Sequence, residues 1–227
     1  DSNVAPDMRL SLEGLDETAT GQLMAARLGR TPTHQEVEAA MRLCDGNAFW
    51  IQEIAGEIAA SGSQELVTEL SRRTSLDGLL HHRADQLSRS ARALWRVLSS
   101  WQAPLEPALA QALLAPFGAA ADASHYRELT DLGWGQFVDG TRQFALTHQI
   151  LAEAGRSGLP AGVSRPLNEN IARELTRQRA DRARIAQHWE RAEQPGRAAI
   201  AYRQAGESAI ALGAHSLGLA LLERAQE

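Results

Sequence analysis

The sequence predicts a mainly α-helical protein that contains one β-hairpin and ends in antiparallel helical hairpins. Three observations lead to this fold class. Apolar residues recur at the three- and four-residue spacing of buried helix faces through most of the chain. One Asp-Gly pair, at positions 139 and 140, separates two apolar-rich arms, which is the strongest short-range signal for a hairpin. From about Arg165 onward the chain is alanine-rich and has helical spacing throughout.

Length and composition indicate a chain that folds. It has 227 residues, of which 44% are hydrophobic, enough to bury a core in one to three small domains. No apolar run approaches the ~20 residues that cross a bilayer, and the first ten residues lack a signal-peptide pattern. We therefore expect a cytoplasmic protein that does not enter a membrane. The single cysteine, Cys44, falls on a predicted apolar helix face, so we expect it in the core.

All 23 basic residues are arginine. Without lysine the chain can form neither a Schiff base nor the G-x-x-x-x-G-K-[ST] loop that holds nucleotide phosphates, so by itself it is not an ordinary P-loop hydrolase. Residues 1–70 hold twelve acids and four arginines, a net charge of −8, whereas 71–227 hold sixteen acids and nineteen arginines, a net charge of +3. Two arginine-rich stretches, 71–96 and 172–189, could meet an acidic partner or nucleic acid, but their helical spacing favours solvated helix faces.

The first 80 residues predict a small helical bundle. Residues 9–17 have the alternation of a short strand or extended entry, and a helix follows to about Leu28. Thr33, with Glu36 three residues later, matches the capping box of a second helix. Four apolar residues at positions i, i+3, i+4 and i+7 give that helix one buried face: Val37, Ala40, Met41 and Cys44.

A sharp corner follows at the tripeptide Asp-Gly-Asn. Gly46 can take the left-handed conformation that ends one helix, and Asn47 can cap the first free amides of the next. That next helix runs to about residue 61 and is strongly apolar, with Phe49, Trp50, Ile51, Ile54 and Ile58. The two helices are therefore expected to pack around the corner.

Helices also precede and follow the hairpin. Residues 75–88 and 88–101 carry apolar residues in helical register, and 124–133 predict a helix directly before the hairpin. Three helices followed by a hairpin is the order of a winged helix. In the last stretch, 161–227, small residues allow the close approach of antiparallel helices that helical-hairpin repeats use: Ala205, Gly206, Ala209, Ala220 and Ala225.

Taken in order, these features resemble the regulatory half of a STAND-type, AAA+-like signal-transduction ATPase, as in MalT-like and LuxR-like transcription regulators and their cyclase-linked or kinase-linked relatives. "DGNAFWIQEI" (45–54) is similar to the Gly-Asn-Pro corner of the family's helical lid. "SLDGLLHHRADQLSRSARALW" (75–95) resembles the helix that leads from the lid into the winged helix. "FALTHQILAEA" (144–154) resembles the wing strand and helix start, and "IAQHWERAEQPGRAAIAYRQAGESA" (185–209) the opening of the TPR-like arm.

The resemblance implies three domains: the helical lid of a nucleotide-binding module at 1–80, a winged-helix-like domain at 81–160, and the start of a TPR-like arm at 161–227. It implies a regulatory part that closes over ADP or ATP held by a P-loop domain absent from this chain. An effector on the arm would then be coupled to an output domain, such as one that regulates transcription, and the open state would self-associate. The chain would be a fragment of that larger ATPase, with a free-standing remnant as the alternative.

The resemblance also implies two nucleotide contacts. The family's corner lies against adenine and ribose, which implies this position for Gly46, Asn47 and Ala48. Ala48 replaces the family's proline, so a rigid ring is missing from the nucleotide wall. The family's histidine after the wing strand approaches the terminal phosphate of ADP, which implies this role for His148, whose imidazole can donate to a phosphate oxygen. The residues alone leave a purely structural corner and a structural histidine open.

Two other functions remain open. One is a protein-interaction adaptor that uses the helical arm without nucleotide. The other is a DNA-binding winged helix, which the charges disfavour because Arg127 lies beside Glu128 and Asp131 on the helix before the hairpin. No catalytic or metal-binding set is evident, since His81 and His82 are adjacent and point in different directions on a helix. We expect no enzyme activity from this chain alone.

Overall fold

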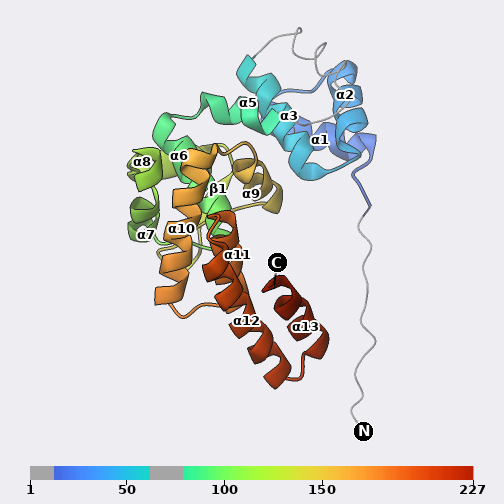
Figure 1. The fold of residues 1–227 in the computed structure, drawn as a ribbon. Helices are drawn as coiled ribbons and strands as arrows, with labels where there is room; N and C mark the ends of the chain where they lie inside the picture. The colour runs from blue at the N-terminus through green and yellow to red at the C-terminus, as the bar shows by residue number, and fades with distance from the viewer. Residues whose placement is uncertain (1–12, 62–78, 227) are drawn as a thin grey trace. The chain divides into compact units, whose positions relative to one another are not determined.

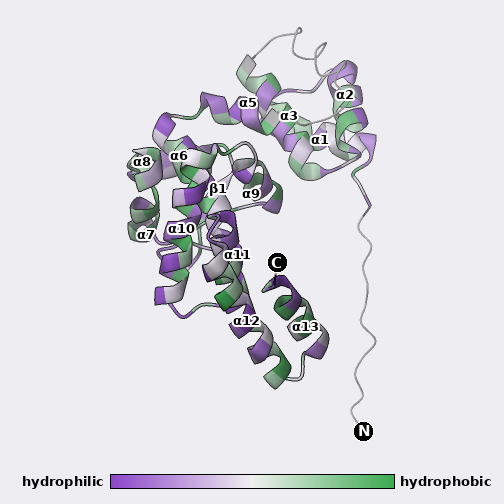
Figure 2. Cartoon of the chain, viewed as in Figure 1, coloured by the Kyte–Doolittle hydropathy of each residue, from purple (hydrophilic) through white to green (hydrophobic). Residues whose placement is uncertain are grey.

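The computed structural model describes residues 13–61 and 79–226 of the chain. These residues are mainly helical and include a two-stranded antiparallel sheet, which confirms the coarse fold class (Figure 1). The chain splits after Arg83 into two compact units. Both carry helices with polar and apolar residues on the same helix (Figure 2). The first four residues of the extended entry expected over 9–17, and the start of the helix expected over 75–88, lie outside the described residues. Among the described helices, none has the length and apolar character needed to cross a membrane.

Three helices form the core of the first unit: α1 (Glu17–Leu28), α2 (His34–Cys44) and α3 (Ala48–Ser61). The predicted capping box of α2 is confirmed, because the Thr33 amide donates to Glu36 at 2.7 Å and the Glu36 amide donates to the Thr33 hydroxyl at 3.3 Å. Burial raises the pKa of the Cys44 thiol to about 12, so this cysteine is an inert core group. All three helices contribute to the core, through Met24, Val37, Ala40, Cys44, Ile51, Ile54, Ala55 and Ile58.

A largely buried helix, α6 (Arg89–Trp101), begins the second unit after α5 (Leu79–Gln86). Nine of its thirteen residues are buried, so other elements must surround it. Trp95, at its middle, donates its indole N–H to the Leu151 carbonyl at 3.1 Å. The elements that pack against α6 include α7 (Pro107–Leu113), α8 (Ala123–Asp131), β2 (Phe144–Leu146) and α9 (Gln149–Arg156). A short 3₁₀ turn at Ala115–Phe117 follows α7.

The hairpin forms where the Asp-Gly pair predicted it. Strand β1 (Gly135–Phe137) pairs antiparallel with β2, so that Phe137 lies opposite Phe144. Gly140 has a φ of 72° in the turn between them, a conformation that costs glycine least. Leu105 and Phe144 exchange two backbone hydrogen bonds of 2.9 Å, which tie the hairpin to the connection between α6 and α7.

The remaining helices each pack against the next along the chain. They are α10 (Ala161–Arg177), α11 (Arg182–Arg191), α12 (Pro195–Ala211) and α13 (His215–Arg224). We call α10 to α13 the arm. The same corner ends the first three of them. At each corner one residue has a positive φ, and the next amide donates at 2.9 Å to the carbonyl five residues back; the three residues are Arg179, Glu193 and Gly213.

The predicted close approach of helices in the arm is confirmed at Gly206. A Cβ atom on Gly206 would lie 2.8 Å from the carbonyl oxygen of Gly218, and one on Gly218 would lie 3.0 Å from the carbonyl oxygen of Gly206. Helices α12 and α13 therefore meet backbone to backbone, and a larger residue at either position would separate them.

Two arginines hold the C-terminal end of α6. Arg156 of α9 donates to the Ser99 carbonyl at 2.9 Å, and Arg184 of α11 donates to the Trp101 carbonyl and lies 5.0 Å from the centre of the Trp101 ring. The last carbonyls of a helix lack partners within the helix and carry its negative partial charge. The two cations satisfy these carbonyls, and burial lowers the pKa of both guanidinium groups.

His188 is buried within the arm as a neutral group. Its Nδ1 atom lies 2.9 Å from Oδ1 of Asn168 in α10. Burial, followed by the charges of Arg191, Arg184 and Arg156, lowers the pKa of His188 to about 3. His188 is therefore a packing residue of the arm.

The buried His188 makes the second unit sensitive to acid. Above the unfolded pKa of about 6.5 the histidine is neutral in both states, whereas below it only the unfolded chain gains the proton until the pH approaches 3. The free energy of unfolding should thus fall as the pH drops, by about 2 kcal/mol between pH 7 and pH 5 from this group. His188→Gln should remove that part of the slope in urea titrations followed by tryptophan fluorescence. The matched control His215→Gln, at an exposed residue of α13, should keep it; equal slopes in both variants would contradict the assignment.

Candidate functional site

The corner between α2 and α3 uses two consecutive residues with positive φ, Asp45 at 46° and Gly46 at 73°. Asn47 then caps α3, because its side-chain oxygen accepts from the amides of Phe49 at 3.0 Å and Trp50 at 3.3 Å. The predicted cap is confirmed. The left-handed turn is shared by two residues, whereas the sequence had assigned it to Gly46 alone.

Gly46 is buried because the chain that enters α1 lies directly on it. Its carbonyl accepts from the Leu15 amide at 2.8 Å, and a Cβ atom at Gly46 would lie 2.4 Å from that nitrogen. A Cβ atom at Gly14 would lie 2.4 Å from the carbonyl oxygen of Asp45. Two backbones thus meet at the corner, and only glycine fits at either position. The buried side of Gly46 is occupied by the chain's own backbone.

Asp45, Asn47 and Ala48 are exposed at the corner, whereas Gly46 is buried. Ala48 is the first residue of α3, a position that favours proline because its amide has no partner within the helix. A ligand at this corner would meet Asn47 and Ala48 and would not reach the buried side of Gly46. The close backbone packing accounts for Gly46, and the nucleotide contact of the three residues stays a prediction.

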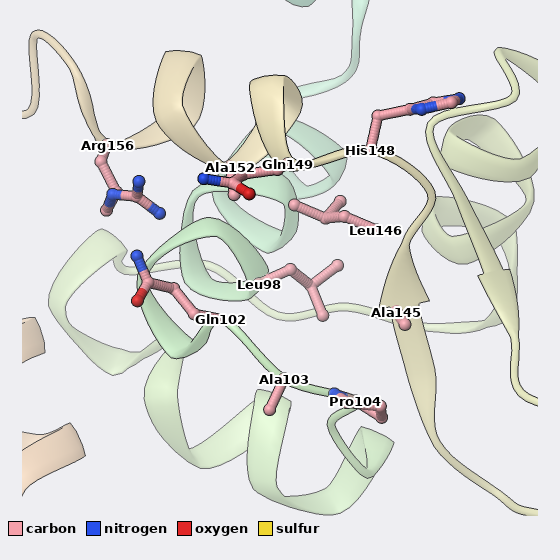
Figure 3. A pocket seen from close by; sticks show the side chains of 10 residues that line it. All are labelled: Leu98, Gln102, Ala103, Pro104, Ala145, Leu146, His148, Gln149, Ala152 and Arg156. Carbon is pink, nitrogen blue, oxygen red and sulfur yellow. The ribbon is translucent and has the colours of Figure 1, made fainter. Parts of the chain in front are cut away.

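His148 lies at the junction between β2 and α9, with its side chain exposed. It has extended backbone angles, φ −137° and ψ 141°, and its side chain makes no capping hydrogen bond to the helix. It borders a hollow of about 450 Å³ between α6, β2 and α9. Figure 3 shows its ring at the rim, directed away from the other side chains that line the hollow.

The hollow beside His148 has an apolar floor that includes Leu98 and Leu146. Besides His148 at the rim, its polar side chains are Gln102, Gln149 and Arg156, and no carboxylate lines it. In Figure 3 Arg156 and Gln102 lie on the same side of the hollow. One cation and two amides over an apolar floor can hold a small anionic group, but they supply no nucleophile with an adjacent base.

A buried ion cluster lies on α3 beyond the corner and was not predicted. Arg83 of α5 pairs with Glu53, and its Nε lies 4.0 Å from Glu57, which also contacts Nε2 of His82 at 3.1 Å. The prediction of solvated faces for the arginine-rich stretches is wrong for Arg83. A signal was present, because Arg83 follows the buried Leu80 by three residues and so falls on the apolar stripe. Removing one partner of such a buried pair typically lowers the free energy of unfolding by about 3–5 kcal/mol. The cluster therefore stabilises the contact between α5 and α3.

The candidate residues fall into two groups. The Gly46 corner belongs to the first unit and His148 to the second, so each is a candidate site of its own unit. Within residues 13–61 and 79–226, no group of three or more histidine, cysteine, aspartate or glutamate side chains is placed to hold a metal ion.

Comparisons of the chain with models of protein families, with curated proteins and with solved structures found no match.

The close approach at the corner predicts an unequal cost for two glycine substitutions. Gly46→Ala combines a positive φ with a backbone clash and should cost about 2–5 kcal/mol. The control Gly140→Ala has a φ of 72° but nothing within 4 Å of the added Cβ atom, so it should cost about 1–2 kcal/mol. Native-state hydrogen exchange of the α2 and α3 amides and of the hairpin amides measures each cost locally. Equal costs would show that the approach of residues 14 and 15 to the corner is loose.

Proposed function

We propose that this chain is the regulatory part of a STAND-type signal-transduction ATPase. In this proposal residues 1–80 are the helical lid, 81–160 a winged-helix-like domain, and 161–227 the start of a TPR-like arm. The observation that carries it is a succession along one chain: a glycine-asparagine helix corner, then three helices with a hairpin, then antiparallel helices joined by one repeated corner. Each feature is common by itself, so the support comes from their order.

The nucleotide would be held by a P-loop domain outside these 227 residues, because the chain has no lysine for a phosphate-binding loop. Asn47 and Ala48 offer an exposed surface to adenine and ribose, and Gly46 shapes the corner that presents them. His148 is exposed at the start of α9, where its imidazole and the helix amides can donate to a phosphate of ADP or ATP.

The proposed mechanism is a shift in population between two arrangements. A ligand moves such an equilibrium only by its difference in affinity for the two states. ADP that contacts both the corner and His148 would favour a closed state, and loss of either contact would release it. An effector on the arm would favour the open state, which would self-associate and act on an output domain, such as one that regulates transcription in the cytoplasm.

An adaptor function without nucleotide is the second candidate, and one observation favours it. Large apolar side chains of α12 and α13 are more than half exposed, namely Ile200, Leu217 and Leu219. Such a surface suits a protein partner. DNA binding by α8 has less support, because Glu128 accepts from the backbone amide and hydroxyl of Ser88, at 3.0 and 2.8 Å, and Asp131 is exposed beside Arg127.

ADP affinity of the complete protein tests the proposal. His148→Ala should weaken ADP binding about tenfold or more, because it removes a charge-assisted hydrogen bond to phosphate. Ala48→Pro should retain the fold and bind ADP at least as tightly, since proline is favoured at the first helical position. The control His215→Ala should bind like the parent in isothermal titration calorimetry.

Two results would contradict the proposal. One is a complete coding sequence without a G-x-x-x-x-G-K-[ST] loop. The other is unchanged ADP affinity in a folded His148→Ala protein. Either result would favour the adaptor.

A further inference from the structure

A groove of about 600 Å³ lies between α11 and α12. Its two walls have the same pattern, since each helix contributes residues at positions i, i+3 and i+7. These residues are Arg182, Ile185 and Trp189 from α11, and Arg197, Ile200 and Gln204 from α12. The corner between α10 and α11 adds Arg179, held at a φ of 55°. The groove therefore combines an apolar floor with three arginines.

Among the described residues, Arg179 and Arg182 of the groove have no carboxylate partner, and Arg197 shares one. Arg182 donates to the neutral amide oxygen of Gln204. Arg197 lies over the Trp189 ring, 4.6 Å from its centre, and 3.8 Å from Glu169, a carboxylate that Arg173 of α10 already holds at 2.6 Å. In the part of the chain that is described, the Arg179 side chain makes no hydrogen bond or ion pair. No acidic residue lines the groove.

Other arginines of the arm do have close acidic partners. Distances between nitrogen and oxygen are 2.6 Å in one pair and 2.7 Å in two others: Arg165 with Glu193, Arg177 with Glu174, and Arg224 with Glu190. These three arginines outside the groove are thus neutralised by carboxylates, whereas no acidic residue lines the groove and its arginines give it a positive surface. Carboxylates are the complement that a guanidinium fork binds best, and they can do so with two parallel hydrogen bonds.

The floor and the spacing of the arginines specify the occupant further. Ile185 and Trp189 are largely buried, whereas Ile200 is 53% exposed and leaves apolar surface open to a ligand side chain. Arg182 and Trp189, over which Arg197 lies, are separated by seven residues of helix, a rise of about 10 Å. An extended peptide covers that distance in about three residues.

We propose that this groove binds an acidic peptide segment of a partner protein, in which two carboxylates about three residues apart flank an apolar side chain. This inference adds to the proposed function the chemical class of the effector, an acidic peptide. It rests on the proposed function only where it gives the peptide a signalling role. Binding itself requires no nucleotide. Single-stranded nucleic acid fits the groove less well, because Arg197 covers the Trp189 face on which a base would stack.

The test uses the 227-residue chain without nucleotide and a fluorescein-labelled peptide of three Glu-Leu-Ser-Glu repeats. Fluorescence anisotropy should show saturable binding that weakens with salt. The double variant Arg179→Glu with Arg182→Glu should bind about tenfold to a hundredfold more weakly, from the loss of charge-assisted hydrogen bonds. The control pair Arg127→Glu with Arg142→Glu makes the same change in net charge at exposed residues of α8 and the hairpin tip, and it should bind like the parent. A peptide with glutamine in place of glutamate should not bind.

Three results would overturn the proposal: no saturable binding of the acidic peptide, an equal loss in the two double variants, or tighter binding of an oligothymidylate of matched length. Circular dichroism of the exposed arginine variants checks that they retain the fold. None of these measurements uses ADP. The peptide proposal can therefore be wrong while the nucleotide proposal is right, and the reverse also holds.

Discussion

The second unit depends on the burial of helix α6. Its indole side chain at Trp95 bonds to α9, and its contact with α9 is so close that a Cβ atom on Gly155 would lie 2.0 Å from the hydroxyl oxygen of Ser99. Its last carbonyls accept from Arg156 and Arg184, which belong to α9 and α11. One helix therefore supports the hairpin, helix α9, and the arm. A displacement of α6 would break hydrogen bonds to α9 and α11 and disturb its packing against β2, which suits a unit that moves as one body.

Much of the fold could be predicted because it depends on local rules. The capping box at Thr33, the cap at Asn47 and the turn at Gly140 each follow from the conformational preferences of a few neighbouring residues. The core faces of α2, α3 and α6 follow from helical periodicity. The close approach at Gly206 was also predictable, since a small residue within an alanine-rich helix indicates that another backbone lies near.

The features that could not be predicted depend on contacts between distant parts of the sequence. The pairing of Arg83 with Glu53 joins residues thirty positions apart, and spacing alone does not distinguish a buried arginine from a solvated one. Position 46 requires glycine for a second reason, because residues 14 and 15 pack against it. The residues next to Gly46 in the sequence do not reveal that contact. For the candidate site, the residues predicted the corner at Gly46 and Asn47, whereas the role of His148 was implied by the resemblance alone. Their contact with nucleotide came from a resemblance, and it remains a proposal.

The central proposal is that nucleotide contacts two places, the corner between α2 and α3 and the start of α9. Hydrogen exchange of the complete protein, with and without saturating ADP, tests it most directly, because protection is read at both places in one experiment. The account predicts that ADP slows exchange of the amides from Asn47 to Ile51 and from His148 to Leu151, while exchange in α13 is unchanged. Protection at neither segment, or at only one of them, would contradict the proposal.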